Sequence, residues 1–207
     1  MTRFSSYLMV LALSVFTSGQ MSAQVISIPQ DQVVYEFVGQ FNNTPTTSQQ
    51  FGYISTAKGL SSIFTDNTTQ DETTALLTFV TNANTDRVIV NGPFKIINRT
   101  GTTTIYLNTP PSDFSDASTF SQGTPIQVSD YSQQVILNTD NNTFVTVHTN
   151  TVTQVPTFTL NGMTYRLGRM GNKFRTNYSG EANATGSSPS GWFAGNAVGV
   201  GGSANPN

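Results

Sequence analysis

The sequence contains no cysteine, so it can form neither a disulfide bond nor a thiolate metal site, and it offers no cysteine nucleophile. Charge is also scarce, since Asp, Glu, Lys and Arg make up 10% of the 207 residues. The chain has one histidine, which cannot form a His-rich zinc site. Its formal net charge of −2 gives no general attraction to nucleic acid or to an anionic membrane. We therefore expect no metal, no cofactor and no nucleic-acid partner.

The longest apolar run, residues 8–16, lies close to the N-terminus. Arg3 precedes it, and a polar segment of small residues ending at Ala23 follows it. This order is typical of a secretory signal peptide, and the run is too short to span a bilayer as a helix. We expect residues 1–23 to be cleaved and the protein to be secreted or periplasmic. The remainder has eight basic and eleven acidic side chains and no second run long enough for a transmembrane helix.

The rest of the chain has the length of one domain, which we place at residues 24–200, followed by a flexible Gly/Ser/Asn tail at 201–207. Thr, Asn, Ser and Gln replace charge on its surface. Thr favours strands because its branched Cβ fits the pleated surface, and 11% of the residues are aromatic. The composition predicts a single all-β, antiparallel domain. Turn signals at short intervals indicate about a dozen short strands in a small barrel or a sandwich.

The clearest local pattern is residues 72–108, where three turn signals separate four apolar runs. The signals are residues 82–86, 91–93 and 98–101, all containing Asn or Gly, which tolerate the positive φ of hairpin turns. The pattern predicts a four-stranded meander that serves as scaffold. Its charged residues after Glu72 lie at or near the expected turns: Asp86, Arg87, Lys95 and Arg99.

Most of the other expected strands are five to seven residues long. They cover residues 32–41, 51–55, 124–129, 134–138, 143–149, 163–167, 173–181 and 192–200. Pro156 divides the stretch 152–160, and Asn161-Gly162 predicts a tight hairpin turn. The irregular stretch 109–123 is a candidate lid over a site.

Aromatic residues on one face of the first strands suggest a lumen. If the strands close into a barrel, an apolar pocket would be lined by Tyr35, Phe37, Phe51, Tyr53 and Phe79. Glu36 and Arg166 would supply polar contacts to a ligand in this pocket only if their strand faces turn inward. An inward Glu36 would be a desolvated carboxylate suited to acid–base chemistry, whereas an outward Glu36 would be an ordinary surface residue.

Half of the basic residues that follow residue 23 lie within ten positions: Arg166, Arg169, Lys173 and Arg175. With Gly168 and Gly171 between them, they suggest a hairpin with a positive rim. Such a rim would capture an anionic glycan through charge-assisted hydrogen bonds. The simpler interpretation is a solvated turn whose charges protect a sheet edge.

His148 is the only imidazole, on the same strand face as Phe144 and Thr146. Its simpler interpretation is a histidine at the surface or at a sheet edge. Trp192 would stack on a sugar if exposed, but Trp192 and Phe193 point to opposite faces, so one of them belongs to the core.

Two oxygen-rich segments suit calcium in principle, residues 113–116 and 140–142. Asx turns explain both without a metal, because Asp and Asn side chains bond to nearby backbone amides.

Two functions remain open. The first is an exported, non-catalytic β-domain with a surface-interaction or structural role in the cell envelope or extracellular space, since no cluster of catalytic residues occurs. The second is a closed barrel that binds or isomerises a small lipophilic molecule. Lipocalins, dirigent-type proteins and allene-oxide-cyclase-type proteins resemble the predicted domain in strand count and polarity, a likeness of fold alone. An outer-membrane barrel ranks third, because it needs strands of about ten residues.

Overall fold

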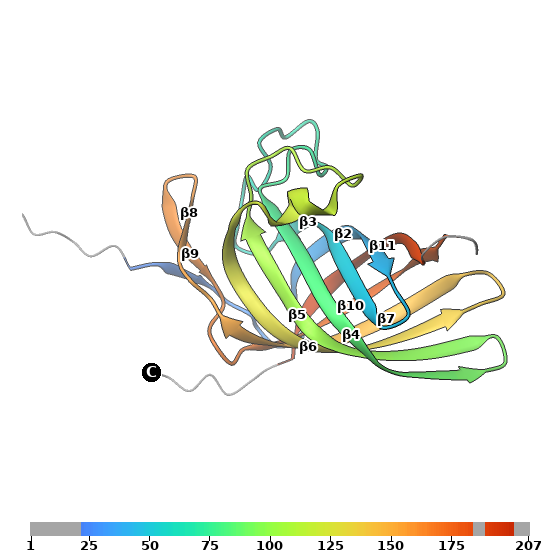
Figure 1. The fold of residues 1–207 in the computed structure, drawn as a ribbon. Coiled ribbons are helices and arrows are strands. Elements are labelled where there is room, and N and C mark those ends of the chain that lie inside the picture. The colour runs from blue at the N-terminus through green and yellow to red at the C-terminus, as the bar shows by residue number, and fades with distance from the viewer. Residues whose placement is uncertain (1–21, 184–188, 201–207) are drawn as a thin grey trace, which may run out of the picture.

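The computed structural model, which describes residues 22–183 and 189–200, contains a closed antiparallel barrel of eight strands (Figure 1). The strands are β2 (Val33–Asn43), β3 (Thr47–Ala57), β4 (Leu77–Asn91), β5 (Phe94–Leu107), β6 (Thr124–Asn138), β7 (Thr143–Gln154), β10 (Lys173–Ala182) and β11 (Ser190–Gly199). They follow the order β10-β11-β2-β3-β4-β5-β6-β7, and β7 pairs with β10 to close the ring. The predicted all-β domain with a small barrel is confirmed. The expected signal peptide (except Ser22 and Ala23) and the expected tail lie outside the described residues.

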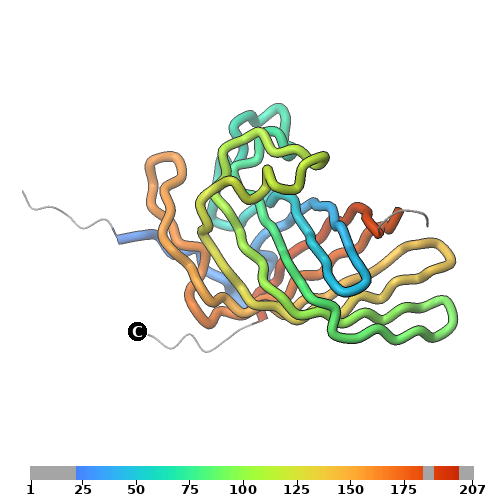
Figure 2. The backbone as a smooth tube through the Cα atoms, in the orientation of Figure 1, coloured from blue at the N-terminus to red at the C-terminus, as the bar shows by residue number. Residues whose placement is uncertain are grey.

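A three-stranded sheet lies beside the barrel, with β1 (Gln24–Ile26), β9 (Met163–Leu167) and β8 (Phe158–Leu160) in that order (Figure 2). The turn at Asn161-Gly162 joins β8 to β9, and both of its residues have positive φ. This hairpin is therefore as predicted. Its buried residues Phe158, Leu160 and Leu167 join the main apolar cluster.

The strands of the barrel are longer than the sequence suggested. Residues 72–108 form two strands rather than four, because only the signal at 91–93 is a turn. Residues 82–86 continue β4 and residues 98–101 continue β5, where Ala83 pairs with Gly101. Gly101 supplies close backbone approach here, since a Cβ on it would lie 2.1 Å from the carbonyl oxygen of Asn82. Likewise 124–129 and 134–138 are one strand. The barrel strands have 10 to 15 residues, so the expected length of five to seven residues was wrong for them, whereas β9 (Met163–Leu167) has the five residues predicted.

The two ends of the barrel differ (Figures 1 and 2). The hairpins β2–β3, β4–β5 and β6–β7 turn at one end, while long connections lie at the other: 58–76, 108–123 and 155–172. Buried Ile63, Phe64 and Leu77 pack into the core at the second end. The long connections therefore contribute buried side chains to the main apolar cluster at this end.

The stretch 109–123 packs on the outside of the barrel, not over its opening. It contains the 3-10 helix η1 (Ala117–Ser121), and Phe120 is fully buried against Phe51 with ring centroids 5.4 Å apart. Thr78 in β4 donates its hydroxyl to the carbonyl oxygen of Phe120 at 2.7 Å. The segment covers the outer face of β3 and β4, so it does not serve as a lid in this structure.

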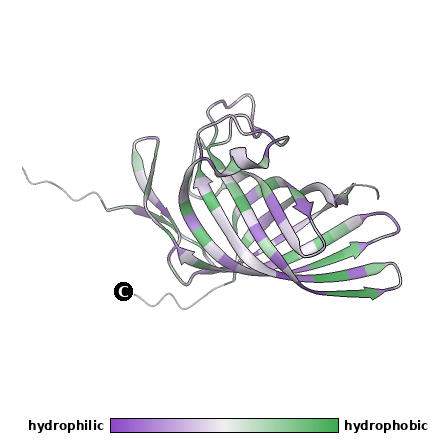
Figure 3. Cartoon of the chain, viewed as in Figure 1, coloured by the Kyte–Doolittle hydropathy of each residue, from purple (hydrophilic) through white to green (hydrophobic). Residues whose placement is uncertain are grey.

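The hairpins β4–β5 and β6–β7 project beyond the other strands, and Figure 3 shows apolar residues along both. Val88, Val90, Phe94 and Val145 are exposed on them. In the described part of the chain, no helix has the length and apolar character needed to cross a membrane.

Candidate functional site

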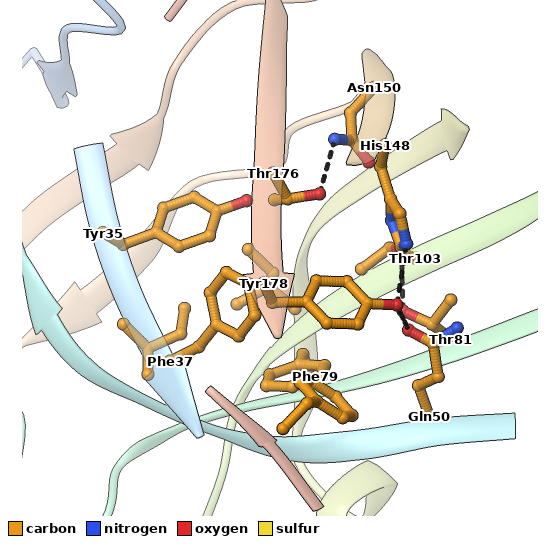
Figure 4. A pocket seen from close by; sticks show the side chains of 13 residues that line it. Tyr35, Phe37, Gln50, Phe79, Thr81, Thr103, His148, Asn150, Thr176 and Tyr178 are labelled. Carbon is orange, nitrogen blue, oxygen red and sulfur yellow. Dashed lines mark hydrogen bonds between the residues drawn. The ribbon is translucent and has the colours of Figure 1, made fainter. Parts of the chain in front are cut away.

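Aromatic side chains fill the centre of the barrel. Phe37 of β2 contacts Phe79 of β4 at a ring-centroid distance of 5.7 Å and Tyr178 of β10 at 6.0 Å, while Tyr178 contacts Phe193 of β11 at 4.6 Å. Tyr35 lines the same space, which encloses a cavity of only about 30 Å³ (Figure 4). Tyr35, Phe37 and Phe79 therefore face the lumen, as the alternation along their strands predicts.

Tyr178 is the centre of a buried polar network (Figure 4). Its hydroxyl donates to Oε1 of Gln50 at 2.8 Å, a bond drawn in Figure 4. The same hydroxyl accepts from Nε2 of Gln133 at 2.7 Å. Nε2 of His148 lies 3.0 Å from the same oxygen. A tyrosine hydroxyl has one proton and two lone pairs. The hydroxyl proton is already used in the hydrogen bond to Gln50. The imidazole must therefore donate from Nε2, which fixes the histidine tautomer.

His148 is inside the barrel, so the expectation of a surface or edge histidine was wrong. It is 4% exposed, and its ring stacks on Tyr131 of β6 with centroids 4.6 Å apart and planes at 12°. Burial, and secondarily the positive charge of Arg99, lowers the pKa of His148 to about 3. The imidazole is consequently neutral at physiological pH.

A second cavity of about 240 Å³ lies at the end with the short hairpins. Its apolar wall comes from several strands and includes Phe41, Val88, Ile97, Val135, Leu137 and Phe144. Polar side chains also line it: Ser48, Gln50, Thr85, Arg99, Gln133, Thr146 and Tyr178. Gln50 and Tyr178 line the smaller inner cavity as well, so the tyrosine network separates the two spaces and forms the floor of the larger one.

Arg99 is the charged group on this floor and is 6% exposed. Its Nε donates to the hydroxyl of Thr85 at 3.3 Å, and its Nη1 donates to Oε1 of Gln133 at 3.4 Å. Burial lowers the pKa of Arg99, while Tyr178 and Tyr131 act in the opposite direction. A guanidinium nevertheless stays protonated in proteins. The floor of the cavity is therefore a buried cation whose partners, within the described residues, are neutral.

Sequence reasoning missed Arg99 because residues 98–101 resembled a turn. In the continuous strand β5, Arg99 is two residues from Ile97 and six from Ile105, so the period of two places all three on the inner face. The register agrees, since Arg99 pairs with Thr85 and Gln133, which also line the cavity. The alternation would have identified Arg99 if the strand had not been divided.

Several residues predicted to line a pocket face away from the lumen. Glu36 is exposed on the outer face of β2 and accepts a hydrogen bond from Thr56 at 3.0 Å. Phe51 and Tyr53 are buried on the outside of β3, where Phe51 packs on Phe120 and Tyr53 on Phe64 and Phe114. The expectation that Phe51 and Tyr53 line the lumen was wrong, and the inward condition set for Glu36 is not met.

The basic cluster is not a hairpin. Arg166 lies in β9 of the small sheet, while Lys173 and Arg175 lie in β10 of the barrel, and Arg169 is in the connection between them. All four side chains are exposed. None is among the residues that line the two lumen cavities.

The other candidates have local explanations. Phe193 is buried, whereas Trp192 is half exposed and contacts Phe114 with ring centroids 4.6 Å apart. One residue of the pair is therefore in the core and the other at the surface, as expected.

The two oxygen-rich segments form Asx turns. Oδ1 of Asp113 accepts from the amide of Ser115, and other Asx turns follow at Asp116 and Asn141. The described residues contain no group of three or more His, Asp or Glu side chains that could hold a metal ion.

Comparison of the chain with models of protein families, with curated proteins and with solved structures finds no match. The site must therefore be interpreted from its own geometry: a cavity with an apolar wall, a hydrogen-bonded floor and a buried guanidinium.

Proposed function

We propose that this protein binds a small lipophilic molecule in the cavity at the short-hairpin end of its barrel. The observation that carries the proposal is the cavity of about 240 Å³ with apolar walls, inside a barrel whose centre is filled by aromatic side chains. Small-molecule sites are typically apolar clefts of about 300–1,000 Å³ with a few polar groups. This cavity falls just below that range, so a small ligand fits it best.

Binding is favoured over isomerisation by the state of the polar groups. The Tyr178 hydroxyl already makes three hydrogen bonds, which use its proton and both lone pairs. His148 donates from Nε2 and has a pKa of about 3. A general acid or base needs a pKa near the working pH and a free position facing the substrate. Neither residue meets both conditions.

We also propose that the protein acts after export. The N-terminal pattern at residues 1–23 predicts export, so the ligand would be bound in the periplasm or outside the cell.

The experiment is a fluorescence titration with N-phenyl-1-naphthylamine, a neutral apolar probe, on the purified protein. Val135→Trp on the cavity wall should weaken binding at least about tenfold. Val147→Trp is the matched control, because Val147 is exposed on the outer face of the neighbouring strand β7. Thermal unfolding of each variant checks the fold, and Leu137→Trp at the same wall provides a second filling variant. Equal probe binding by the wild type and the wall variants would contradict the proposal.

A surface-interaction role is the second candidate, favoured by the exposed apolar side chains of the projecting hairpins. Val90 and Phe94 flank the β4–β5 turn and are 64% and 45% exposed. The occupant to test is a second copy of the chain. Light scattering should show concentration-dependent association that Val90→Ser with Phe94→Ser removes, and a monomer at all concentrations would contradict it.

A further inference from the structure

The buried guanidinium of Arg99 has N–H donors that bond to no acceptor among the described residues. A guanidinium has five N–H donors. Within the described residues, Arg99 uses two of them, Nε to Thr85 at 3.3 Å and Nη1 to Gln133 at 3.4 Å. Both bonds are long for N–H···O bonds, whose usual length is about 2.9–3.0 Å. The whole Nη2 group has no partner among these residues.

The charges around the cavity do not neutralise Arg99. Lys95 and Arg99 are the two residues with a formal charge among those that line it, and both are cationic. Tyr131, Tyr178 and His148 also face the guanidinium, but burial raises the pKa of both tyrosines and lowers that of the histidine, so all three are neutral. A buried cation without an anionic partner is costly. An anion in the cavity would remove that cost.

A second polar group on the same floor also lacks a partner. Thr146 lines the cavity and is 2% exposed; its Oγ1 lies near the Tyr178 hydroxyl, whose pKa burial raises and Thr146 in part lowers, but makes no hydrogen bond of good geometry among the described residues. Buried hydroxyls are nearly always hydrogen-bonded, so an unpaired one at a cavity indicates a missing partner. Thr146 and Arg99 lie on the inner faces of β7 and β5, on either side of β6.

We infer that the ligand is an amphiphile with one carboxylate, which pairs with Arg99 on the cavity floor. The inference rests on the proposed function and names the chemical class of its ligand. A planar guanidinium matches a carboxylate with two parallel hydrogen bonds. The apolar body of the ligand extends toward the mouth, between side chains such as Phe41, Ile97 and Leu137. Lys95, exposed at the rim, adds positive potential along the entry path.

The test compares ligands that differ only in their head group. Displacement of N-phenyl-1-naphthylamine is measured with decanoate and with 1-decanol at pH 8. The wild type should bind decanoate at least about tenfold more tightly than decanol. Arg99→Met should abolish this preference, because the variant should bind decanoate more weakly and decanol with unchanged affinity. Arg87→Met is the matched control and should leave the preference intact, because Arg87 is exposed and does not line the cavity.

The outcomes separate the two proposals. Equal displacement by decanoate and decanol in the wild type would overturn the carboxylate anchor and leave the lipophilic cavity intact. If the probe itself does not bind in the cavity, the proposed function fails and the inference fails with it. The head-group comparison in the wild type does not require the Arg99 variant to fold, and Arg99→Lys, which keeps the charge but loses the planar fork, should retain part of the preference.

Discussion

Nε2 of His148 lies 3.0 Å from the hydroxyl oxygen of Tyr178, in the interior of the barrel. The imidazole donates this bond, so the histidine is both buried and held in one neutral tautomer. The pair forms the partition between the small inner cavity and the larger cavity at the mouth. The hydrogen bond holds the floor of the larger cavity in place. Protonation of His148 or removal of the Tyr178 hydroxyl should therefore lower the free energy of unfolding.

The first prediction concerns pH. The pKa of His148 is about 3 in the folded protein and 6.5 in the unfolded chain. Between these values the unfolded chain binds a proton that the folded protein excludes, so stability from this group is present above pH 6.5 and is lost as the pH falls toward 3. The loss is about 1.4 kcal/mol per pH unit. Urea unfolding at pH 7, 6, 5 and 4 measures it.

His148→Gln is the control, because glutamine keeps an N–H donor but does not titrate. Its stability should fall less steeply over the same pH range. Parallel pH profiles for the two proteins would show that the histidine does not exclude a proton on folding.

The second prediction is for Tyr178→Phe. Removing the hydroxyl leaves Gln50, Gln133 and His148 without their common partner. Unsatisfied buried polar groups cost about 1–3 kcal/mol each, so we expect a loss of about 2–4 kcal/mol in the free energy of unfolding, moderated by water entering from the mouth. Tyr106→Phe on the outer face of β5 is the matched control and should change stability by about 0.5 kcal/mol or less. A similar loss in both variants would contradict the network.

The sequence predicted the fold class because alternation and turn chemistry are local. Turns occur at Asn91-Gly92 and Asn161-Gly162, and the positive φ values of Gly92, Asn161 and Gly162 explain why Gly and Asn occur there. Asn82, Asn98 and Gly101 belong to the same residue types but lie within strands, because ladder pairing on both sides overrides their local preference. No local signal distinguishes the two groups. Gly101 illustrates the difficulty, since its need for glycine comes from Asn82 on the neighbouring strand.

The candidate site was harder to predict than the fold. Tyr35, Phe37 and Phe79 were identified because aromatics on one strand face indicate a core. Arg99 and His148 were not, since charged and titratable residues usually face solvent. Which face of each strand turns inward depends on barrel closure, so residues such as Phe51 and Glu36 were assigned to the wrong side or left open. Closure is a property of all eight strands together.

The third prediction concerns the segment 108–123 that covers β3 and β4. Phe120 is fully buried and contacts Phe51 and Phe114, so Phe120→Ala should cost about 3–5 kcal/mol. Phe94→Ala is the matched control, because Phe94 is 45% exposed at the β4–β5 turn, and its truncation should cost about 1 kcal/mol or less. Chemical denaturation measures both. Limited proteolysis should cut the Phe120→Ala protein within 108–123, and equal resistance of the two variants would contradict the packing of this segment.

The fourth prediction uses two adjacent isoleucines on β5. Ile97 lines the mouth cavity, whereas Ile96 is on the outer face and pairs with Ile136. Ile97→Ala enlarges the cavity by about three carbon atoms, so the preferred chain of a carboxylate ligand should lengthen. Each buried methylene contributes about 0.8 kcal/mol, which corresponds to about a fourfold change in affinity. Dodecanoate has two more methylenes than decanoate, so it should gain about fifteenfold over decanoate in Ile97→Ala relative to the wild type, as measured by displacement of the neutral probe. Ile96→Ala should leave the chain-length preference unchanged, and the same shift in both variants would mean that the ligand does not occupy the space beside Ile97.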